Sequence, residues 1–281
     1  MTSSSSSSAT HPLDEALQLA SSSDPGQYEG RTHPGYWNMV GPFGGVTAAT
    51  LLQAVMQHPD RLGEPLSLTV NYAGALAEGP FKVQATPVRT NRSTQHWTLS
   101  ILQPDAEGAP VVTTTATAVT AVRRETWSVG DVPMPPVQPP AQHQSIPPQG
   151  GVEWLNRYEM RPIAGLIPQA WDGSGDHSLT QLWMRDAPPR PLDFCALAAL
   201  ADVFFPRVWL RRARRVPAGT VSITVYFHAS TAQLQATGTG YLLGQARGQE
   251  FRNGFFDQTA QLWNEAGTLL ATSHQIVYYK E

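Results

Sequence analysis

The chain has 281 residues, of which 41% are hydrophobic and 15% charged, and its formal net charge is −3. This composition is typical of a globular protein with a sizeable apolar core, and the nearly balanced charge argues against a polyanion such as nucleic acid as a partner. No uninterrupted apolar stretch approaches the length of a membrane span, and the Ser-rich start lacks the basic and apolar regions of a secretory signal. We therefore expect a cytoplasmic protein without membrane insertion.

The cysteine content excludes two kinds of site. Cys195 is the only cysteine, so the chain can form neither an intrachain disulfide nor a thiolate zinc cluster. It lies in an apolar run, which favours a buried packing role over a nucleophilic one. Because no H-E-x-x-H metal motif occurs either, we expect neither a metal nor a cofactor.

Two segments differ in composition from the rest. Residues 1–27 are rich in Ser and predict a flexible N-terminal segment, with one short amphipathic stretch at 13–20 that favours a helix. Residues 129–150 contain many prolines, which fix φ and remove backbone donors, and so predict an extended linker. The chain then divides into an N-terminal domain at 28–128 and a C-terminal domain at 151–281.

The two predicted domains repeat the same order of elements. An apolar helix is predicted over 45–57 and again over 193–205, and the strand 67–72 (SLTVNY) has a counterpart 155 residues later at 222–227 (SITVYF). Each half closes with a hairpin, turned at Gly108 or Gly267, and a long terminal strand. One helix with several hairpin-linked strands predicts an α+β fold of two tandem units, each with a central helix wrapped by an antiparallel β-sheet.

Asp202 is a carboxylate in an otherwise apolar context, between the runs FCALAALA and VFF. A low dielectric raises the pKa of a carboxylate and strengthens its electrostatic action, and both effects suit a general base or a group that orients water. The spacing leaves open the alternative that Asp202 caps the helix or pairs with Arg207 or Arg211.

Two further polar features are candidates for the same site. The segment 220–227 alternates strictly, which predicts that Thr220, Ser222 and Thr224 share one face of a strand. Gln275 lies in the terminal strand, where alignment of the two halves puts Thr117 at the matching position. Each pattern also fits an ordinary half-buried strand with a solvated face.

These residues and their contexts resemble one known family. Asp202, Thr220 and Gln275, in LADVFFPRVW, GTVSITVYFH and GTLLATSHQIVYY, are similar to motifs of the acyl-CoA thioesterase II family and its thioesterase-like superfamily. The sequence PFGG, which contains Gly44 and Gly45 and opens the first helix, resembles the Gly-Gly helix start of that family. The resemblance covers about residues 28–281 and implies a double hot-dog fold.

The resemblance also implies an activity and its residues. Asp202, Thr220 and Gln275 would orient a water that attacks the carbonyl of acyl-CoA and releases free fatty acid and CoA, with Ser222 as the reserve for Thr220. Backbone N–H groups at Gly44 and Gly45 are expected to face the oxyanion. For the phosphates of CoA the candidates are arginines, namely Arg92, Arg207 and Arg211.

Other functions fit the sequence less well. A serine hydrolase is disfavoured because no G-x-S-x-G motif occurs. Asp172 and His177 superficially resemble the Asp and His of hot-dog enoyl-CoA hydratases, but they lie in a Gly-rich segment without the rest of that motif. A non-catalytic acyl-CoA or lipid-binding protein would share the fold, and only convergence of Asp202, Thr220 and Gln275 separates it from the enzyme. Exposed strand edges leave a homo-oligomer open.

Overall fold

The computed structural model describes residues 10–147 and 151–281. Their strands form one 13-stranded antiparallel sheet in the order β1-β2-β4-β5-β6-β3-β9-β13-β12-β10-β8-β7, with β11 paired to β12. The first half contributes β1 (Ala20–Ser21), β2 (Gln27–Arg31), β3 (Glu64–Tyr72), β4 (Pro80–Thr90), β5 (Thr94–Pro104) and β6 (Pro110–Ala121). The second half contributes β7 (Tyr158–Ala164), β8 (Thr180–Asp186), β9 (Ala218–Phe227), β10 (Leu242–Arg247), β11 (Phe251–Arg252), β12 (Phe255–Asn264) and β13 (Leu269–Tyr279).

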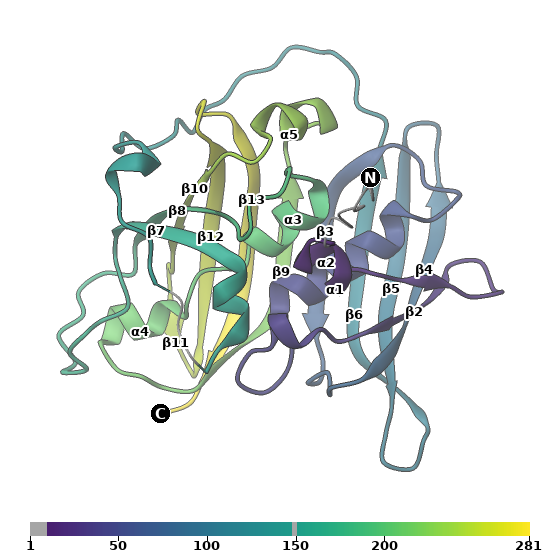
Figure 1. Cartoon of the computed structure of the whole chain (residues 1–281), viewed down its shortest axis with the longest axis horizontal. Coiled ribbons are helices and arrows are strands. Elements are labelled where there is room, and N and C mark those ends of the chain that lie inside the picture. Colours follow the sequence, from purple (N-terminus) through teal and green to yellow (C-terminus); the bar gives the residue numbers. More distant parts are fainter. Residues whose placement is uncertain (1–9, 148–150) are drawn as a thin grey trace, which may run out of the picture.

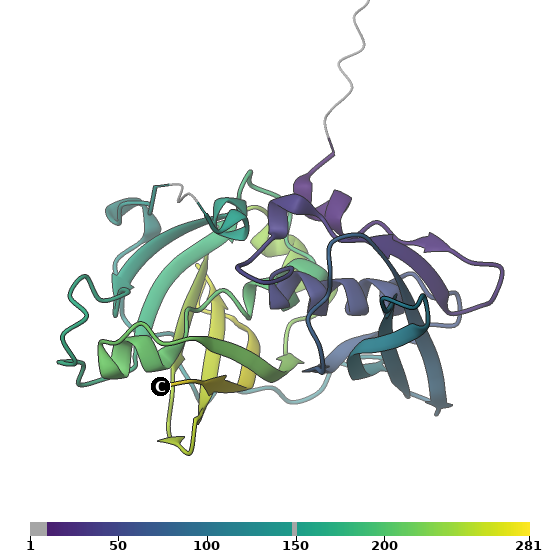
Figure 2. The same cartoon turned by 90° about the horizontal axis from the view of Figure 1, so that it is seen from below.

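The described residues contain fewer helices than strands. The helices are α1 (Pro12–Ala16), α2 (Gly44–Met56), α3 (Phe194–Leu200), α4 (Arg207–Arg212) and α5 (Thr231–Thr237), with 3₁₀ turns η1 (Pro34–Tyr36), η2 (Pro140–Gln142) and η3 (Glu153–Arg157). The longest helix is α2. Figures 1 and 2 show that α2 and α3 lie next to each other over the same face of the curved sheet. The α+β architecture of two helix-on-sheet units predicted from the repeat is confirmed.

The two units meet along one strand pair, β3 with β9. Thr69 pairs with Thr224 at the centre of this seam, and their hydroxyl oxygens lie 3.0 Å apart. The two threonines are 155 residues apart, which is the offset of the repeat. Because antiparallel pairing of equivalent residues creates a two-fold relationship, the seam is the local symmetry axis of the duplication.

The central helices run antiparallel and bury most of their side chains. The start of α2 contacts the end of α3, and Gln53 near the end of α2 meets Cys195 at the start of α3, where the thiol lies 3.4 Å from Gln53 Oε1. Leu51, Leu52 and Leu197 are fully buried between the helices and the sheet. Each such leucine stabilises the fold by about 1.5–3 kcal/mol relative to an exposed one, so the two units share one core.

Around α1 the N-terminal segment packs against the body of the protein, which corrects the prediction of a flexible segment for this part, whereas residues 20–25 are exposed. Leu13 and Leu17 are buried, as is Ala16, so the apolar face predicted from the amphipathic pattern covers the core. Arg190 from the second half binds both Asp14 and Asp193, at 2.7 and 2.6 Å, and so holds α1 beside the start of α3. The boundary at residue 28 falls inside β2, and the Ser tract at 1–9 lies outside the described residues.

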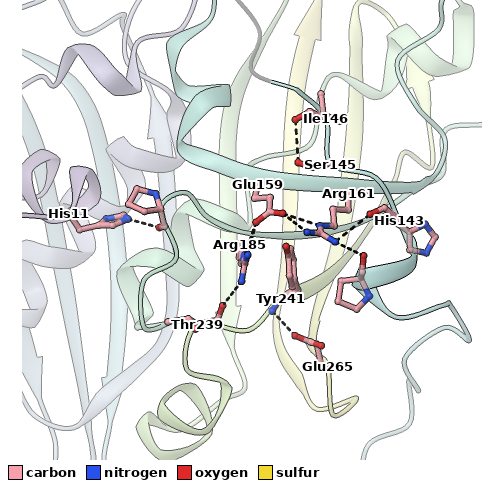
Figure 3. A network of polar contacts seen from close by, with 12 residues as sticks. His11, His143, Ser145, Ile146, Glu159, Arg161, Arg185, Thr239, Tyr241 and Glu265 are labelled. Carbon is pink, nitrogen blue, oxygen red and sulfur yellow. Dashed lines mark hydrogen bonds and ion pairs between the residues drawn. The ribbon is translucent and has the colours of Figure 1, made fainter.

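Residues 129–147 of the Pro-rich segment cross the second unit without forming a strand, and η2 is the one helical turn among them (Figure 1). Figure 3 shows how this segment is attached: Arg161 donates to the carbonyl oxygens of Pro140 and His143, at 2.9 and 3.4 Å. The same guanidinium and that of Arg185 bind Glu159. Since prolines cannot donate backbone hydrogen bonds, the linker is held mainly through its carbonyl groups.

Candidate active site

Asp202 lies just beyond α3, in a buried turn. The predicted helix 193–205 ends at Leu200, so Asp202 is not helical, although its N–H still reaches the Ala199 carbonyl at 3.1 Å. Ser273 on β13 donates to the Ala201 carbonyl at 3.2 Å and satisfies one of the free acceptors that every helix end leaves. This contact holds the turn on the sheet and directs Asp202 toward β13.

Gln275 and Thr220 converge on this carboxylate. Gln275 Nε2 donates to Asp202 Oδ1 at 2.7 Å, and the hydroxyl of Thr220 donates to Gln275 Oε1 at 3.3 Å. Asp202 and Gln275 are 8% and 3% exposed, so these bonds form away from bulk solvent. The three residues named from the sequence thus form one chain of hydrogen bonds from three separate elements.

A β-bulge decides which hydroxyl of β9 faces the site. The register shifts at Val221, so that Thr220 pairs with Val277 while Ser222 pairs with Ile276. Directly paired residues share a face, and Ile276 is 41% exposed on the side opposite Gln275. Thr220 therefore faces the site, whereas Ser222 points to the outer face. The predicted strict alternation, and with it Ser222 as a reserve, is wrong because a bulge inserts one extra residue.

The first half contributes the start of α2. The backbone N–H of Gly45 donates to Asp202, and a Cβ added at Gly44 would lie 2.8 Å from Asp202 Oδ2. A side chain at that position would therefore displace the carboxylate. The Tyr72 hydroxyl donates to the Gly44 carbonyl at 2.8 Å and fixes the helix start from the other side. The Gly45 N–H, expected to face an oxyanion, is thus directed at the carboxylate.

Burial and hydrogen bonding act on the pKa of Asp202 in opposite directions. Burial raises it from 3.8 to about 7, against the lowering effect of the hydrogen bonds from Gln275 and Gly45. The N-terminus of α2 also favours a negative charge at this place. A carboxyl group with a pKa near neutrality can both accept and return a proton, which is the property of a general base.

The arginines predicted to bind CoA differ in their exposure to solvent. Arg207 is completely buried and donates to the Phe205 and Ser178 carbonyls and to the Thr180 hydroxyl. Its guanidinium is enclosed by protein, so the expectation that it contacts CoA phosphates is wrong. Arg211 is exposed on α4 and donates to the Gly175 carbonyl at 2.8 Å, and its contact with CoA stays a prediction.

Arg92 lies at the far end of the first unit. It belongs to the turn between β4 and β5, two residues before Thr94. Thr94 pairs with Ala121 on β6, and Ala121 in turn pairs with Glu64 at the start of β3, so this turn lies at the Glu64 end of β3. Tyr72, which marks the site, is at the other end of that nine-residue strand, about 27 Å away. The structure therefore does not bring Arg92 to Asp202.

The first half lacks the equivalent chemistry. Across the symmetry of the seam, Leu68 corresponds to Ile223, and their neighbours on β6 and β13 are Ala118 and Gln275. The counterpart of Gln275 is thus Ala118 rather than the predicted Thr117. Pro65, which precedes a matching bulge, occupies the place of Thr220. The polar site exists once in the duplicated fold.

Two residues of this region were missed from the sequence. Tyr72 gives no signal there, because a tyrosine at a strand end is common. Gln258 does give one: it is a polar residue in the row of β12 that otherwise reads Phe256, Ala260 and Leu262, all buried. Its side chain lies next to that of Gln275, since the two residues pair directly.

Among the residues that the structure describes, no group of three His, Cys, Asp or Glu side chains is arranged to hold a metal ion. In the same residues, no helix is long and apolar enough to cross a membrane. A cavity of about 510 Å³ lies at the other end of α2, lined by Asp14 of α1 and residues 17–20 after it, together with Gln53, Gln57, Arg190 and Asp193.

Comparisons with known proteins place this chain in a family. The model of the acyl-CoA thioesterase N-terminal domain matches residues 33–121, and that of the C-terminal domain matches residues 132–279. No curated protein matches the chain significantly.

Solved structures show the same fold. A conserved hot-dog protein of unknown function from Alicyclobacillus acidocaldarius is 47% identical, with a TM-score of 0.90 over 97% of this chain and 99% of that one. An acyl-CoA thioesterase II from Mycobacterium marinum is 18% identical, with a TM-score of 0.74 over 95% and 98% of the two chains. The dehydratase domain of PpsC from Mycobacterium tuberculosis is 12% identical, with a TM-score of 0.56 over 97% and 99%, and shares the fold alone. With both halves matched by its two domain models, this double hot-dog chain belongs to the acyl-CoA thioesterase family.

Proposed function

We propose that the protein hydrolyses acyl-CoA thioesters to free fatty acid and CoA, with Asp202 as the general base. The observation that carries this proposal is the 2.7 Å hydrogen bond from Gln275 to the buried carboxylate of Asp202, with Thr220 bound to the same amide. Such a carboxylate can take a proton from a water while the bonded amide keeps its orientation.

The reaction follows from these groups. Asp202 accepts a proton as the water oxygen adds to the thioester carbonyl carbon, and the carbonyl electron pair moves to oxygen. When the carbonyl re-forms, the C–S bond breaks and the thiolate takes up the proton held by Asp202. Fatty acid and CoA are then released. No covalent nucleophile is needed, because a thioester is more reactive than an oxygen ester.

Two competing chemistries lack support. Burial raises the pKa of the Cys195 thiol well above its usual value, which makes it a poor nucleophile. Asp172, the candidate acid of a hydratase, binds the N–H of Ser174, and His177 is 56% exposed. Neither residue forms a buried pair of the kind that hydration of an enoyl group would use.

The test is release of free thiol from acyl-CoA over a panel of chain lengths, with wild type, Asp202→Asn and a matched control. Asp186 is also a buried aspartate, 3% exposed, and lies outside the site. We expect Asp202→Asn to lower kcat by about 100-fold or more while Asp186→Asn retains most activity. Absence of thiol release by the wild type on every substrate would favour the non-catalytic acyl-CoA-binding alternative.

A further inference from the structure

Gln258 carries a buried amide whose donors have no partner. It is 2% exposed, and its Nε2 forms no hydrogen bond within the described residues. Leaving such a group unpaired costs about 1–3 kcal/mol. Buried unpaired donors are rare in folded proteins and call for a specific explanation, such as a ligand.

The position of Gln258 points to the acyl-CoA site. It pairs directly with Gln275 across β12 and β13, so both side chains project from the same face with their Cβ atoms about 4.5–5.5 Å apart. The two side chains have the same length. The free amide therefore belongs to a side chain that projects from the same face of the sheet, and from the neighbouring position, as the side chain that binds Asp202.

Three other donors of the site are already engaged. The Gly45 N–H and one N–H of Gln275 are directed at Asp202, and the Thr220 hydroxyl is directed at Gln275. Attack on a thioester places negative charge on the carbonyl oxygen, which needs a donor of its own. Among the described side chains named at this site, Gln258 is the one whose amide N–H groups form no hydrogen bond.

We propose that Gln258 Nε2 donates a hydrogen bond to the carbonyl oxygen of the bound thioester. The contact strengthens as water adds to the carbonyl carbon and the oxygen gains the electron pair, and it relaxes when the carbonyl re-forms and the C–S bond breaks. Gln258 is then a catalytic residue that touches the substrate. This inference rests on the proposed thioesterase function and adds the recognition of its oxyanion.

Two unreactive CoA analogues test the contact directly. In a ketone analogue a CH₂ group stands between the acyl carbonyl and sulfur, and in a thioether analogue the carbonyl is absent as well. The ratio of their dissociation constants reports the carbonyl contact, and calorimetry measures both. The variants are Gln258→Met, which keeps length and loses the amide, and Gln261→Met on the same strand, which faces the opposite side and pairs with Thr272.

In the wild type and in Gln261→Met we expect the ketone analogue to bind more tightly, by roughly 2- to 10-fold. In Gln258→Met the ratio should fall to near one, and kcat/KM for acyl-CoA should fall by about 10-fold. Thermal unfolding supplies a second readout. Because an apolar side chain of the same shape removes a buried unpaired donor, Gln258→Met should unfold at the same or a higher temperature.

An unchanged binding ratio in Gln258→Met, in a protein whose wild type does hydrolyse acyl-CoA, overturns the inference and leaves the proposed function intact. The amide would then be satisfied by something other than the substrate. If the wild type neither hydrolyses acyl-CoA nor binds the analogues, the proposed function itself fails, and this inference fails with it. Should Gln258→Met not fold, Gln258→Leu is measured in the same way with the same expected ratio.

Discussion

The amide of Gln275 donates to Oδ1 of Asp202 across 2.7 Å, although 73 residues separate them in the chain. The bond stabilises the ionised form of a carboxyl group that burial otherwise keeps protonated. Through this contact the last strand of the fold tunes the acidity of a turn that follows the second central helix.

Replacing Gln275 by Met should raise the pKa of Asp202 further, because the hydrogen bond to its charged form is lost. A base works only when deprotonated, so the rate of the wild type should rise with pH through about 7. In the variant the acidic limb of the kcat/KM profile should move up by about one to two pH units. An unmoved limb in Gln275→Met would mean that another group sets the profile.

Asp202 should cost stability at alkaline pH. Its pKa rises from 3.8 in the unfolded chain to about 7 in the folded protein, so the folded state holds the proton more tightly between about pH 4 and 7. Stability therefore falls as the pH rises through this window. Asp202→Asn removes this cost, and the variant should gain on the wild type by up to about 4 kcal/mol above pH 7.

Thermal midpoints of wild type and Asp202→Asn, measured at pH 5 and pH 8.5, test this expectation. The pKa of Asp186 is also raised to about 7 by burial, but Asp186 is present in both proteins and cancels in the comparison. An equal difference between the two proteins at both pH values would contradict a raised pKa at Asp202.

Gly44→Ala should reduce kcat while the protein remains folded. The new Cβ would lie 2.8 Å from Asp202 Oδ2 and 3.2 Å from the Tyr72 hydroxyl, so the carboxylate must move away from the start of α2. A displacement of this kind should cost about 10- to 100-fold in rate. Gly74→Ala is the control, because its nearest neighbour would be 4.0 Å away, and thiol release by both variants gives the comparison.

The bulge in β9 makes neighbouring hydroxyls unequal. Thr220→Val keeps the shape of the side chain and removes its bond to Gln275, so kcat should fall by about 10-fold. Ser222→Ala changes the outer face and should leave kcat within about two-fold of wild type. Steady-state kinetics of the two variants decide the matter, and a larger loss in Ser222→Ala would place the bulge elsewhere.

Sequence reasoning reached the fold through its repetition. The offset of 155 residues between two similar strands reappears at the seam, where Thr69 faces Thr224. It also reached Asp202, since a carboxylate amid apolar residues is expensive to bury. Both inferences depend on short stretches of sequence, and neither requires knowledge of which strands pair or in which register.

The face of Thr220, the burial of Arg207 and the counterpart of Gln275 could not be predicted in this way. They depend on strand register and on packing between distant segments, which local sequence patterns do not encode. The extra residue at Val221 turns Thr220 to the face of the sheet opposite to that of Ser222, and no residue type in that strand predicts a bulge. Arg207 is charged yet completely buried, because the nearby Phe205 carbonyl and the distant Ser178 carbonyl and Thr180 hydroxyl accept its hydrogen bonds. The match of Gln275 to Ala118 rather than Thr117 is again a shift of one residue, which alignment of two similar strands cannot resolve.

Gly45 comes from one copy of the repeat and Asp202 from the other, so neither copy owns the site. Two identical subunits related by a two-fold axis would build it twice, once at each crossing of the central helices. In the fused chain the second crossing, where Gln53 meets Cys195, need not form such a site. There Arg190 binds Asp14 and Asp193 and so fixes α1. The two crossings therefore differ: one carries the buried carboxylate of Asp202, and the other anchors α1.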